Sequence, residues 1–206
     1  MATWTAFHPW IKPLVPGCPD PMIDRAVCDA AIEFCEMTQA FVERGAFATR
    51  VGRSVYEVVS EEGSPGMVLG VTLADRSLSP VYIDALVNAY GERWKDHTGQ
   101  PQFYLADSED TLRVYPTPDR IESGHITLAV RPERGATAWD DRLYERYAET
   151  IAEGALARLL NQYATPWAEP SAAMQRRQRF QQGINKVRAK VNSAYTPASP
   201  FAYANL

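Results

Sequence analysis

Histidine and cysteine side chains are the groups of this sequence best suited to metal binding or nucleophilic catalysis. The three histidines are far apart and outside any metal-ligand spacing: His8, His97 and His125. The three cysteines lie in the first fifth of the chain: Cys18, Cys28 and Cys35. On one helix Cys28 and Cys35 would be separated by roughly 10 Å of rise, too far for a disulfide, and no histidine is near enough to complete a zinc site. We interpret the cysteines as small apolar residues of a packed helix.

Two acidic segments are candidates for calcium binding or acid–base chemistry. Residues 107–110 read DSED, but they lack the glycine and the distal glutamate of a hand-like calcium loop, which favours a solvated hairpin turn. Asp140 and Asp141 precede a predicted helix, where acidic side chains cap the first turn. The sequence has no glycine-rich phosphate loop, no nucleophile elbow and no His-Glu-x-x-His motif. We therefore expect no enzymatic activity, no metal and no cofactor.

The basic residues near the C-terminus could bind an anionic partner. No acidic residue follows Glu169, whereas six basic residues do: Arg176, Arg177, Arg179, Lys186, Arg188 and Lys190. Because the whole chain has a net charge of −4, the residues up to Glu169 carry −10. Such an asymmetry indicates partners rather than a fold.

Two interpretations of this basic segment remain open. Six cations could neutralise phosphates of a nucleic acid, and such binding would weaken steeply with salt. However, Phe180 is the only aromatic residue interleaved with the basic residues, and the acidic remainder would repel nucleic acid. A solvated or protein-facing helix therefore fits the sequence better, and a nucleic-acid-binding accessory protein is the alternative.

Residues 192–206 form a tail that carries no charge except its terminal carboxylate. Pro197 and Pro200 interrupt it, and in isolation it cannot bury enough apolar area to offset an ordering entropy of about 1–2 kcal/mol per residue. Four side chains are spaced like anchors along an extended segment: Tyr195, Phe201, Tyr203 and Leu206. We expect the tail to lie in a groove or to add an edge strand to a neighbouring protein, in preference to being a frayed terminus.

Three amphipathic helices are predicted to position these groups. The first lies within residues 20–48, starting at Asp20 and Pro21 and ending at Gly45. The second begins after residue 138, and the third covers 171–191. Their apolar stripes recur at spacings of three and four: Ile23, Val27, Ala30, Phe34, Met37 and Phe41; Leu143, Tyr147, Ile151, Ala155, Leu159 and Tyr163; and Phe180, Ile184, Val187 and Val191. Gly154 would let another helix approach the second one closely.

Between the first two helices the pattern changes to the alternation of antiparallel hairpins. Strands are expected in the segments 53–60, 66–79, 101–119 and 124–133, with a turn at Asp75–Arg76 and a short helix from Ser79 and Pro80. The fold class is therefore α+β. The helices of 20–48 and 138–191 form a bundle, and the antiparallel β region of 49–137 is inserted between them.

Both ends of the chain are expected to be extended. Four prolines predict an extended N-terminal arm over residues 1–19, and the uncharged tail covers residues 192–206. No apolar run is long enough to cross a membrane, and the first residues do not have the pattern of a signal peptide. We therefore expect a protein that is made in a reducing cytoplasm and does not bind membranes.

Five segments follow one another in an informative order: PGCPDPMIDRAVCDAAIEFC, GQPQFYL, DTLRVYPTPD, LAVRPERGATAWDDRLYERYAETIAEGALARLL and PWAEPSAA before the basic helix. This order resembles the head-to-tail adaptor proteins of tailed bacteriophages, the connector or neck proteins that include tail tubular protein A. The resemblance covers roughly residues 14–191. Its most specific part is YERYAETIAEGALARLL followed by PWAEP.

The resemblance implies a structural virion protein of the neck, made in the host cytoplasm. It implies a ring of subunits, usually twelve, that lies beneath the portal, extends the DNA channel and carries the next tail or nozzle component. C-terminal segments of such proteins reach towards the portal, so the six basic residues and the four tail anchors are the expected portal-binding residues. Genomic DNA would pass through without sequence-specific recognition, and an acidic body would repel the duplex and let it slide.

Overall fold

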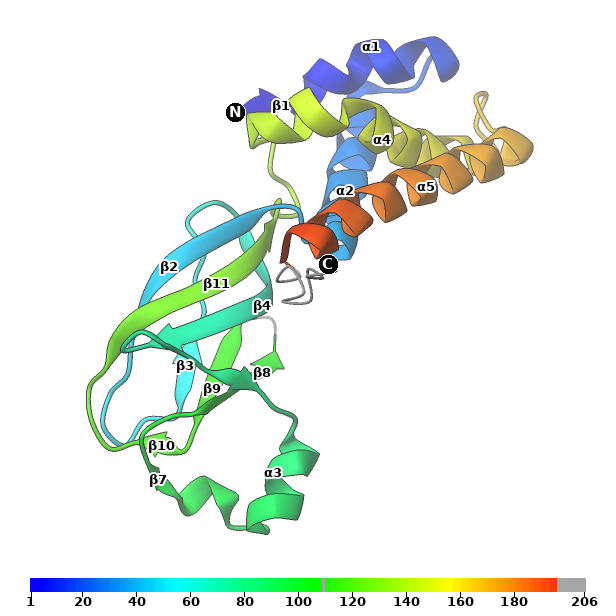
Figure 1. The fold of residues 1–206 in the computed structure, drawn as a ribbon. Helices are drawn as coiled ribbons and strands as arrows, with labels where there is room; N and C mark the ends of the chain where they lie inside the picture. Colours follow the sequence, from blue (N-terminus) through cyan, green and yellow to red (C-terminus); the bar gives the residue numbers. More distant parts are fainter. Residues whose placement is uncertain (109, 196–206) are drawn as a thin grey trace, which may run out of the picture. The chain divides into compact units, whose positions relative to one another are not determined.

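The computed structural model describes residues 1–108 and 110–195, of which 107, 108 and 193–195 are described by their backbone alone (Figure 1). It contains both helices and strands. The chain divides into two compact units. A helical unit consists of Met1–Ala40 and the chain from Pro132 onward, and a sheet unit consists of Phe41–Arg131. The sheet unit is thus inserted into the sequence of the helical unit.

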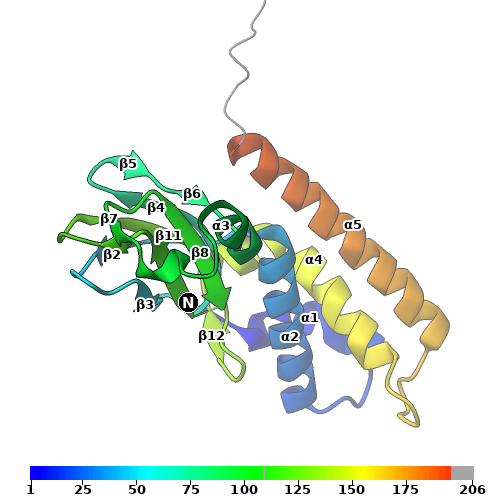
Figure 2. The same cartoon turned by 90° about the horizontal axis from the view of Figure 1, so that it is seen from below.

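Three long helices account for most of the helical unit. Helix α4 contacts both α2 and α5, and α2 also contacts α5 (Figure 2). The elements of this unit are α1 (His8–Ile11), α2 (Asp20–Thr38), α4 (Asp141–Leu160) and α5 (Pro170–Tyr195), two 3-10 turns (Trp4–Phe7 and Lys12–Leu14), and the pairing of β1 (Ala2–Thr3) with β12 (Ala138–Trp139).

The contact between α4 and α5 depends on a glycine. Phe180 of α5 is fully buried. A Cβ atom at Gly154 of α4 would lie 2.9 Å from two carbons of its ring, a separation that real Cβ atoms do not adopt. The prediction that Gly154 allows close helix approach is therefore confirmed. The predicted seam of α5 is also buried at Ile184 and Val187, whereas Val191 is half-buried.

Gly154→Ala is expected to lower the free energy of unfolding by about 1–2 kcal/mol. Alanine is favoured over glycine within a helix by about 1 kcal/mol, but the added methyl group would overpack against a buried ring. Thermal unfolding followed by circular dichroism measures the change. In a Phe180→Leu background, where the ring is absent, the same substitution should cost less; an equal or larger loss there would contradict the clash.

The predicted extended N-terminal arm is wrong, because residues 4–14 form short helical turns. Pro9 and Pro13 lie in the first turns of their segments, where a missing N–H leaves no hydrogen bond unmade. The apolar side chains recur at helical spacing and are buried: Trp4, Phe7, Ile11 and Val15. Nε2 of His8 also lies 2.7 Å from Oδ1 of Asp24 in α2. The arm therefore completes the core of its own unit.

Helix α2 ends at Thr38, seven residues before the predicted stop at Gly45. The hydroxyl of Thr38 donates to the carbonyl of Phe34 (2.7 Å), and Gln39 adopts a left-handed conformation with φ 53°. Gly45 lies in a strand of the sheet unit. The inserted unit therefore begins at Phe41 and not at residue 49, because the predicted helix continued through residues that alternate in burial as a strand.

Helix α5 is longer than predicted and continues to Tyr195. The prediction of an extended tail is therefore wrong for residues 192–195, while residues 196–206 lie outside the described part of the chain. At the start of α4, Asp140 acts as the expected cap. Its carboxylate accepts a hydrogen bond from the backbone N–H of Arg142 (2.8 Å).

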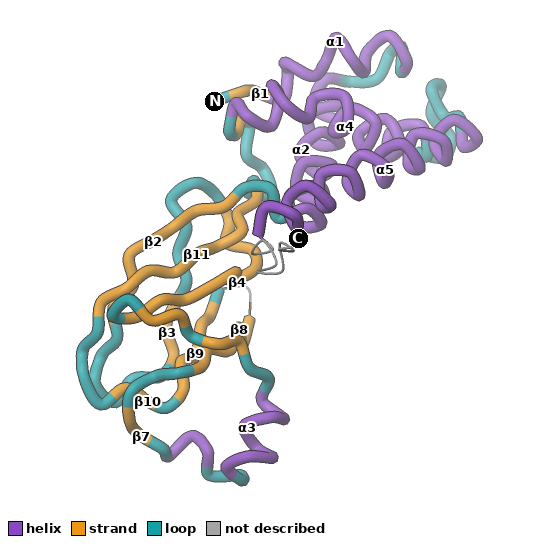
Figure 3. Tube along the Cα trace, in the orientation of Figure 1, coloured by secondary structure: helices purple, strands orange, loops and turns teal. Residues whose placement is uncertain are grey.

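Two four-stranded sheets make up most of the sheet unit (Figure 3). The orders are β2-β11-β4-β5 and β3-β9-β8-β6. The strands are β2 (Val42–Ala48), β3 (Val55–Glu57), β4 (Ser64–Leu73), β5 (Arg76–Ser77), β6 (Ser79–Pro80), β8 (Phe103–Ser108), β9 (Thr111–Tyr115) and β11 (Ser123–Arg131), beside a small pairing of β7 (Thr98–Gly99) with β10 (Thr117–Pro118). Ala74 and Asp75 form the turn between β4 and β5 in left-handed conformations, close to the predicted turn.

The short helix of the sheet unit, α3 (Ile83–Tyr90), starts later than predicted. Ser79 does not cap it; Ser79 and Pro80 instead pair in parallel with β8. The segment from α3 to β9 has its own small core, made of Leu86, Trp94, Leu105 and Tyr115. This core holds α3 in place within the sheet unit.

Candidate functional site

The first half of the predicted basic surface is used inside the molecule. Nη1 of Arg176 lies 2.6 Å from Oε1 of Glu153 in α4, and Nη1 of Arg179 lies 3.6 Å from the same oxygen. Arg177 binds Glu33 of α2 through both guanidinium nitrogens, at 2.6 and 2.9 Å. Three of the six basic residues therefore form ion pairs between α5 and the other long helices, although Arg177 and Arg179 remain more than half exposed.

Glu33 is the centre of a charged cluster at the junction of α2, α4 and α5. Its carboxylate also accepts a hydrogen bond from Arg158 of α4, and the guanidinium groups of Arg158 and Arg177 lie over the ring of Phe180 at 5.9 and 5.6 Å. Burial alone would raise the pKa of Glu33. The hydrogen bond from Arg177 and the positive charges of both arginines outweigh burial and hold the pKa below its usual range.

The second half of the basic surface faces solvent. Lys186 and Arg188 lie on exposed positions of α5, and neither has an ion pair with any residue that the structure describes. Lys190 is exposed on the same stretch of the helix. The apolar seam between them, Ile184 and Val187, is buried against the unit. Lys186 and Arg188 are therefore the cations of this end of α5 that have no ion pair within the described residues.

The predicted tail anchors cannot be compared with the fold. The backbone of Tyr195 is the last turn of α5, and its side chain lies outside the described part. Phe201, Tyr203 and Leu206 lie outside the described residues altogether. The structure therefore brings together the basic residues of the predicted site on one helix and places none of the anchor side chains.

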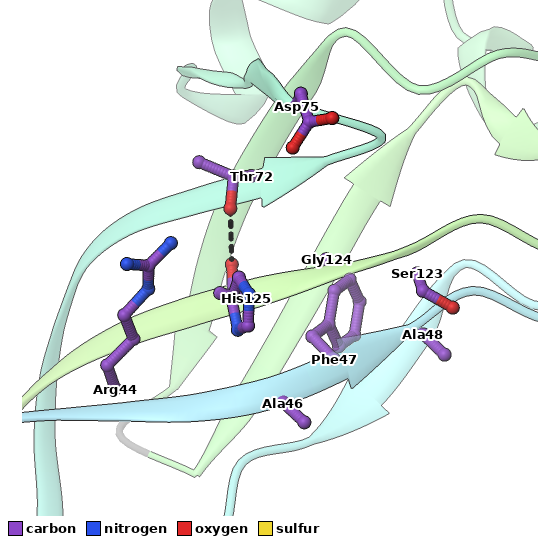
Figure 4. Close-up of a pocket in the computed structure, with 9 residues that line it drawn as sticks. All are labelled: Arg44, Ala46, Phe47, Ala48, Thr72, Asp75, Ser123, Gly124 and His125. Atoms are coloured by element: carbon purple, nitrogen blue, oxygen red, sulfur yellow. Dashed lines mark hydrogen bonds between the residues drawn. The ribbon is translucent and has the colours of Figure 1, made fainter.

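A second surface, which sequence reasoning missed, lies on the outer face of β2, β11 and β4 (Figure 4). A hollow of about 660 Å³ is lined there mainly by small side chains and by three that can carry charge, Arg44, Asp75 and His125. A Cβ atom at Gly124 would lie 1.8 Å from the carbonyl oxygen of Thr72, so this position of the sheet requires glycine. Residues 42–48 read VERGAFA and do not alternate polar with apolar side chains, so the sequence carries no clear signal for this face.

The residues suited to catalysis are dispersed. Nδ1 of His97 lies 2.9 Å from the hydroxyl of Tyr115, His125 is on the outer sheet face, and His8 is in the helical unit. The three cysteines are buried, and burial raises their pKa values. Within residues 1–108 and 110–195, no group of three acidic, histidine or cysteine side chains is arranged to hold a metal ion.

The hydrophobic content of the helices was also compared with that of membrane spans. In the described part of the chain, no helix combines the length and the apolar character needed to cross a membrane.

Comparison with known proteins places this architecture in a family. No curated protein matches the sequence. The model of one protein family, described as SU10 adaptor protein, matches residues 6–201. The match includes the N-terminal turns, the inserted sheet unit and all three long helices, and so covers well over half of the chain. The chain therefore belongs to the SU10 adaptor protein family, the structural adaptors of bacteriophage particles.

Proposed function

We propose that this protein is the head-to-tail adaptor of a tailed bacteriophage, a structural subunit that forms a ring under the portal. The ring extends the DNA channel and joins the capsid to the next tail or nozzle component. The observation that carries the proposal is the family match over residues 6–201, which includes both units. The more specific likeness to tail tubular protein A, and a ring of twelve copies, are part of the same proposal.

The distribution of charge supports a portal-facing role for the end of α5. Arg176, Arg177 and Arg179 form ion pairs with Glu153 and Glu33. Lys186 and Arg188 are exposed and have no ion pair within the described residues, so the attachment rests on these two. The seam of Ile184 and Val187 is buried, and Lys186 and Arg188 flank it on opposite sides, about 200° apart around the helix axis. An acidic surface on the portal is the complementary partner.

The sheet unit supports the conduit part of the proposal. Phe41–Arg131 contains nine basic and thirteen acidic side chains, hence a net charge of −4. A channel wall with an excess of acidic groups repels the phosphates of a passing duplex and so allows it to slide. The protein acts on DNA without sequence-specific recognition and without catalysis.

The test of portal attachment is a charge reversal. Lys186→Glu/Arg188→Glu should weaken binding to the portal protein of the same phage at least tenfold, measured by co-sedimentation and by electron microscopy of rings on portals. Arg93→Glu/Lys95→Glu in the sheet unit makes the same change in net charge at exposed positions and is the matched control. Equal binding by the first variant and the unsubstituted chain would overturn this assignment.

A salt titration with duplex DNA separates this proposal from a nucleic-acid-binding accessory protein. With three of the six cations paired internally, few remain to displace counterions from phosphates. We expect weak binding with a shallow dependence on salt. Submicromolar binding with a steep slope would instead favour the nucleic-acid-binding alternative.

A further inference from the structure

Strand β2 is the edge of its sheet, and within residues 1–108 and 110–195 no strand pairs with its outer side. β2 pairs with β11 alone, and Val42–Ala48 is opposed to Ser123–Ala129. The N–H of Thr49 donates to Glu122, and that of Val130 donates to Phe41, both across this strand pair. Since inward and outward amides alternate along a strand, the backbone groups of Val42, Arg44, Ala46 and Ala48 point away from β11.

These outward groups lack backbone partners. Among the described residues, no backbone hydrogen bond reaches Arg44, Ala46 or Ala48 from the outer side of β2. An unpaired edge of this length is a template for strand addition, and native proteins normally cover or interrupt it. Glu43 blocks one end, because its carboxylate holds Ser60 (2.6 Å) and the backbone of the following loop. From Arg44 to Ala48 the edge is open.

The side chains beside this edge leave room for larger ones. Arg44, Ala46 and Ala48 are exposed and line the same hollow as Ser123 and His125 (Figure 4). The hollow measures about 660 Å³, and small side chains make up most of its floor. A strand added next to β2 would therefore find space for bulky side chains on this face and short ones on the other.

We propose that residues 201–206 of a second copy of this chain add to the outer edge of β2. The sequence Phe201-Ala-Tyr-Ala-Asn-Leu206 contains no proline and follows Pro200 directly, and its two aromatic residues alternate with two alanines. It belongs to the eleven residues beyond Tyr195, none of which has a charged side chain. The edge and the segment thus match in length, and the alternation from Phe201 to Ala204 would place both aromatic rings on one face. Strand addition of this type takes its affinity from the backbone and its specificity from alternate side chains.

Antiparallel pairing gives the added strand a defined register. Phe201 would pair with Ala48, Tyr203 with Ala46 and Asn205 with Arg44, so that both aromatic rings enter the hollow. Ala202 and Ala204 would take the opposite face.

A second copy is the occupant that a ring supplies. This inference rests on the proposed ring, in which each subunit would give one segment and receive one. A ring built from such head-to-tail contacts closes when the last subunit meets the first, and the β2 edge of every subunit is then paired. The same segment would then join neighbours in the ring, in place of the portal contact expected from the sequence.

Disulfide trapping in the full chain tests the register. In Arg44→Cys/Asn205→Cys, mild oxidation of rings formed on the portal should give a ladder of covalent oligomers up to the whole ring. The native cysteines are buried and should not react. Val59→Cys/Asn205→Cys, which places the cysteine at another exposed position of the same unit, is the control and should give no ladder.

Each other result of this trapping overturns the inference. A disulfide within single chains would show that residues 201–206 fold back on the β2 of their own subunit. A disulfide to the portal protein would restore the portal contact expected from the sequence. A ladder in the control variant would show that the cysteines react by chance collision. Rings without a ladder overturn the inference alone. Failure to form any ring overturns the proposed function, and the inference falls with it.

Blocking the edge is a second test that leaves the segment intact. Ala46→Pro removes a backbone N–H that points away from β11. Proline is tolerated in an edge strand, and the preceding Gly45 can adopt the extended backbone conformation that a following proline requires. We expect at least a tenfold loss of ring formation with little change in the melting temperature of the subunit. Ala46→Val keeps the N–H and should assemble normally. Assembly of Ala46→Pro equal to that of Ala46→Val would overturn the inference.

Discussion

Phe180→Ala is expected to lower the free energy of unfolding by about 3–5 kcal/mol, the usual cost of replacing a buried aromatic side chain. The ring is fully buried, fills the space that Gly154 leaves on α4, and contacts the guanidinium groups of Arg158 and Arg177. Its removal would leave a cavity between α4 and α5 and would expose the Glu33 cluster to water. Urea unfolding monitored by circular dichroism measures the loss.

Met174→Ala is the matched control for this experiment. Met174 lies on the same helix but is 76% exposed, so its truncation should change stability by less than about 0.5 kcal/mol. If Phe180→Ala and Met174→Ala melt at the same temperature, then the packing of α5 on α4 contributes little to the stability of the free subunit, and the seam would acquire its partner only on assembly.

Glu33→Ala is expected to cost about 2–3 kcal/mol, the second largest effect among these predictions. The substitution leaves the guanidinium groups of Arg158 and Arg177 facing each other without their shared carboxylate. The loss is smaller than that for a fully buried pair, because Arg177 is half exposed and can turn to water. Chemical denaturation at neutral pH measures it.

The same carboxylate gives a pH-dependent contribution of known sign. Because the folded-state pKa of Glu33 is lowered, its contribution to stability is present above the unfolded-state pKa of about 4.3 and is lost as pH falls through the folded-state pKa. The unsubstituted chain should therefore lose more stability between pH 7 and pH 3 than Glu33→Gln does. Glu43 and Asp140 also have lowered pKa values, but both contribute equally in the two proteins. Parallel pH profiles would refute the role assigned to Glu33.

Helices were predicted well wherever packing alone decides them. Leu143, Ile151, Ala155 and Leu159 of the stripe predicted for the second helix are buried, as is the Gly154 contact, since a helix must bury one face against its neighbour. The stripe was wrong at Tyr163, which follows the end of α4 and is 97% exposed. The cap at Asp140 follows from local hydrogen bonding. The stop of α2 could not be found in this way, because Phe41 continues the helical stripe in sequence while it is buried in the sheet unit.

The N-terminal turns show how proline misleads when its position within a turn is ignored. Pro9 and Pro13 exclude a long helix, yet each is compatible with the first turn of a short one. The spacing of Trp4, Phe7 and Ile11 was the contrary signal, because apolar residues at intervals of three and four predict a helical face. Burial of these side chains supplied the free energy that short turns lack by themselves.

The sequence predicted that α5 is basic but not which of its cations form ion pairs within the molecule. Charge counting identified α5 as basic, yet it could not distinguish Arg177, which binds Glu33 across 144 residues of sequence, from Lys186, which has no ion pair in the described part of the chain. Such pairs depend on tertiary contacts between helices that are distant in the chain. The open edge of β2 was missed for a related reason, because whether a strand lies at an edge depends on sheet order, which a single sequence does not specify.

The position at which the sheet unit is inserted into the chain affects how proteins of this family can diverge in sequence. The polypeptide leaves the helical unit at Ala40 and returns at Pro132. Strands β2 and β11, which begin and end the insert, are adjacent and antiparallel, and next to them the N–H of Val130 donates to the carbonyl of Phe41 at 3.0 Å. Residues paired in this way have Cα atoms about 5.5 Å apart. Genetic recombination at these two points could exchange one insert for a longer or shorter one without stretching the surrounding helices. A phage lineage could thereby replace the sheet unit while it keeps the helical unit unchanged.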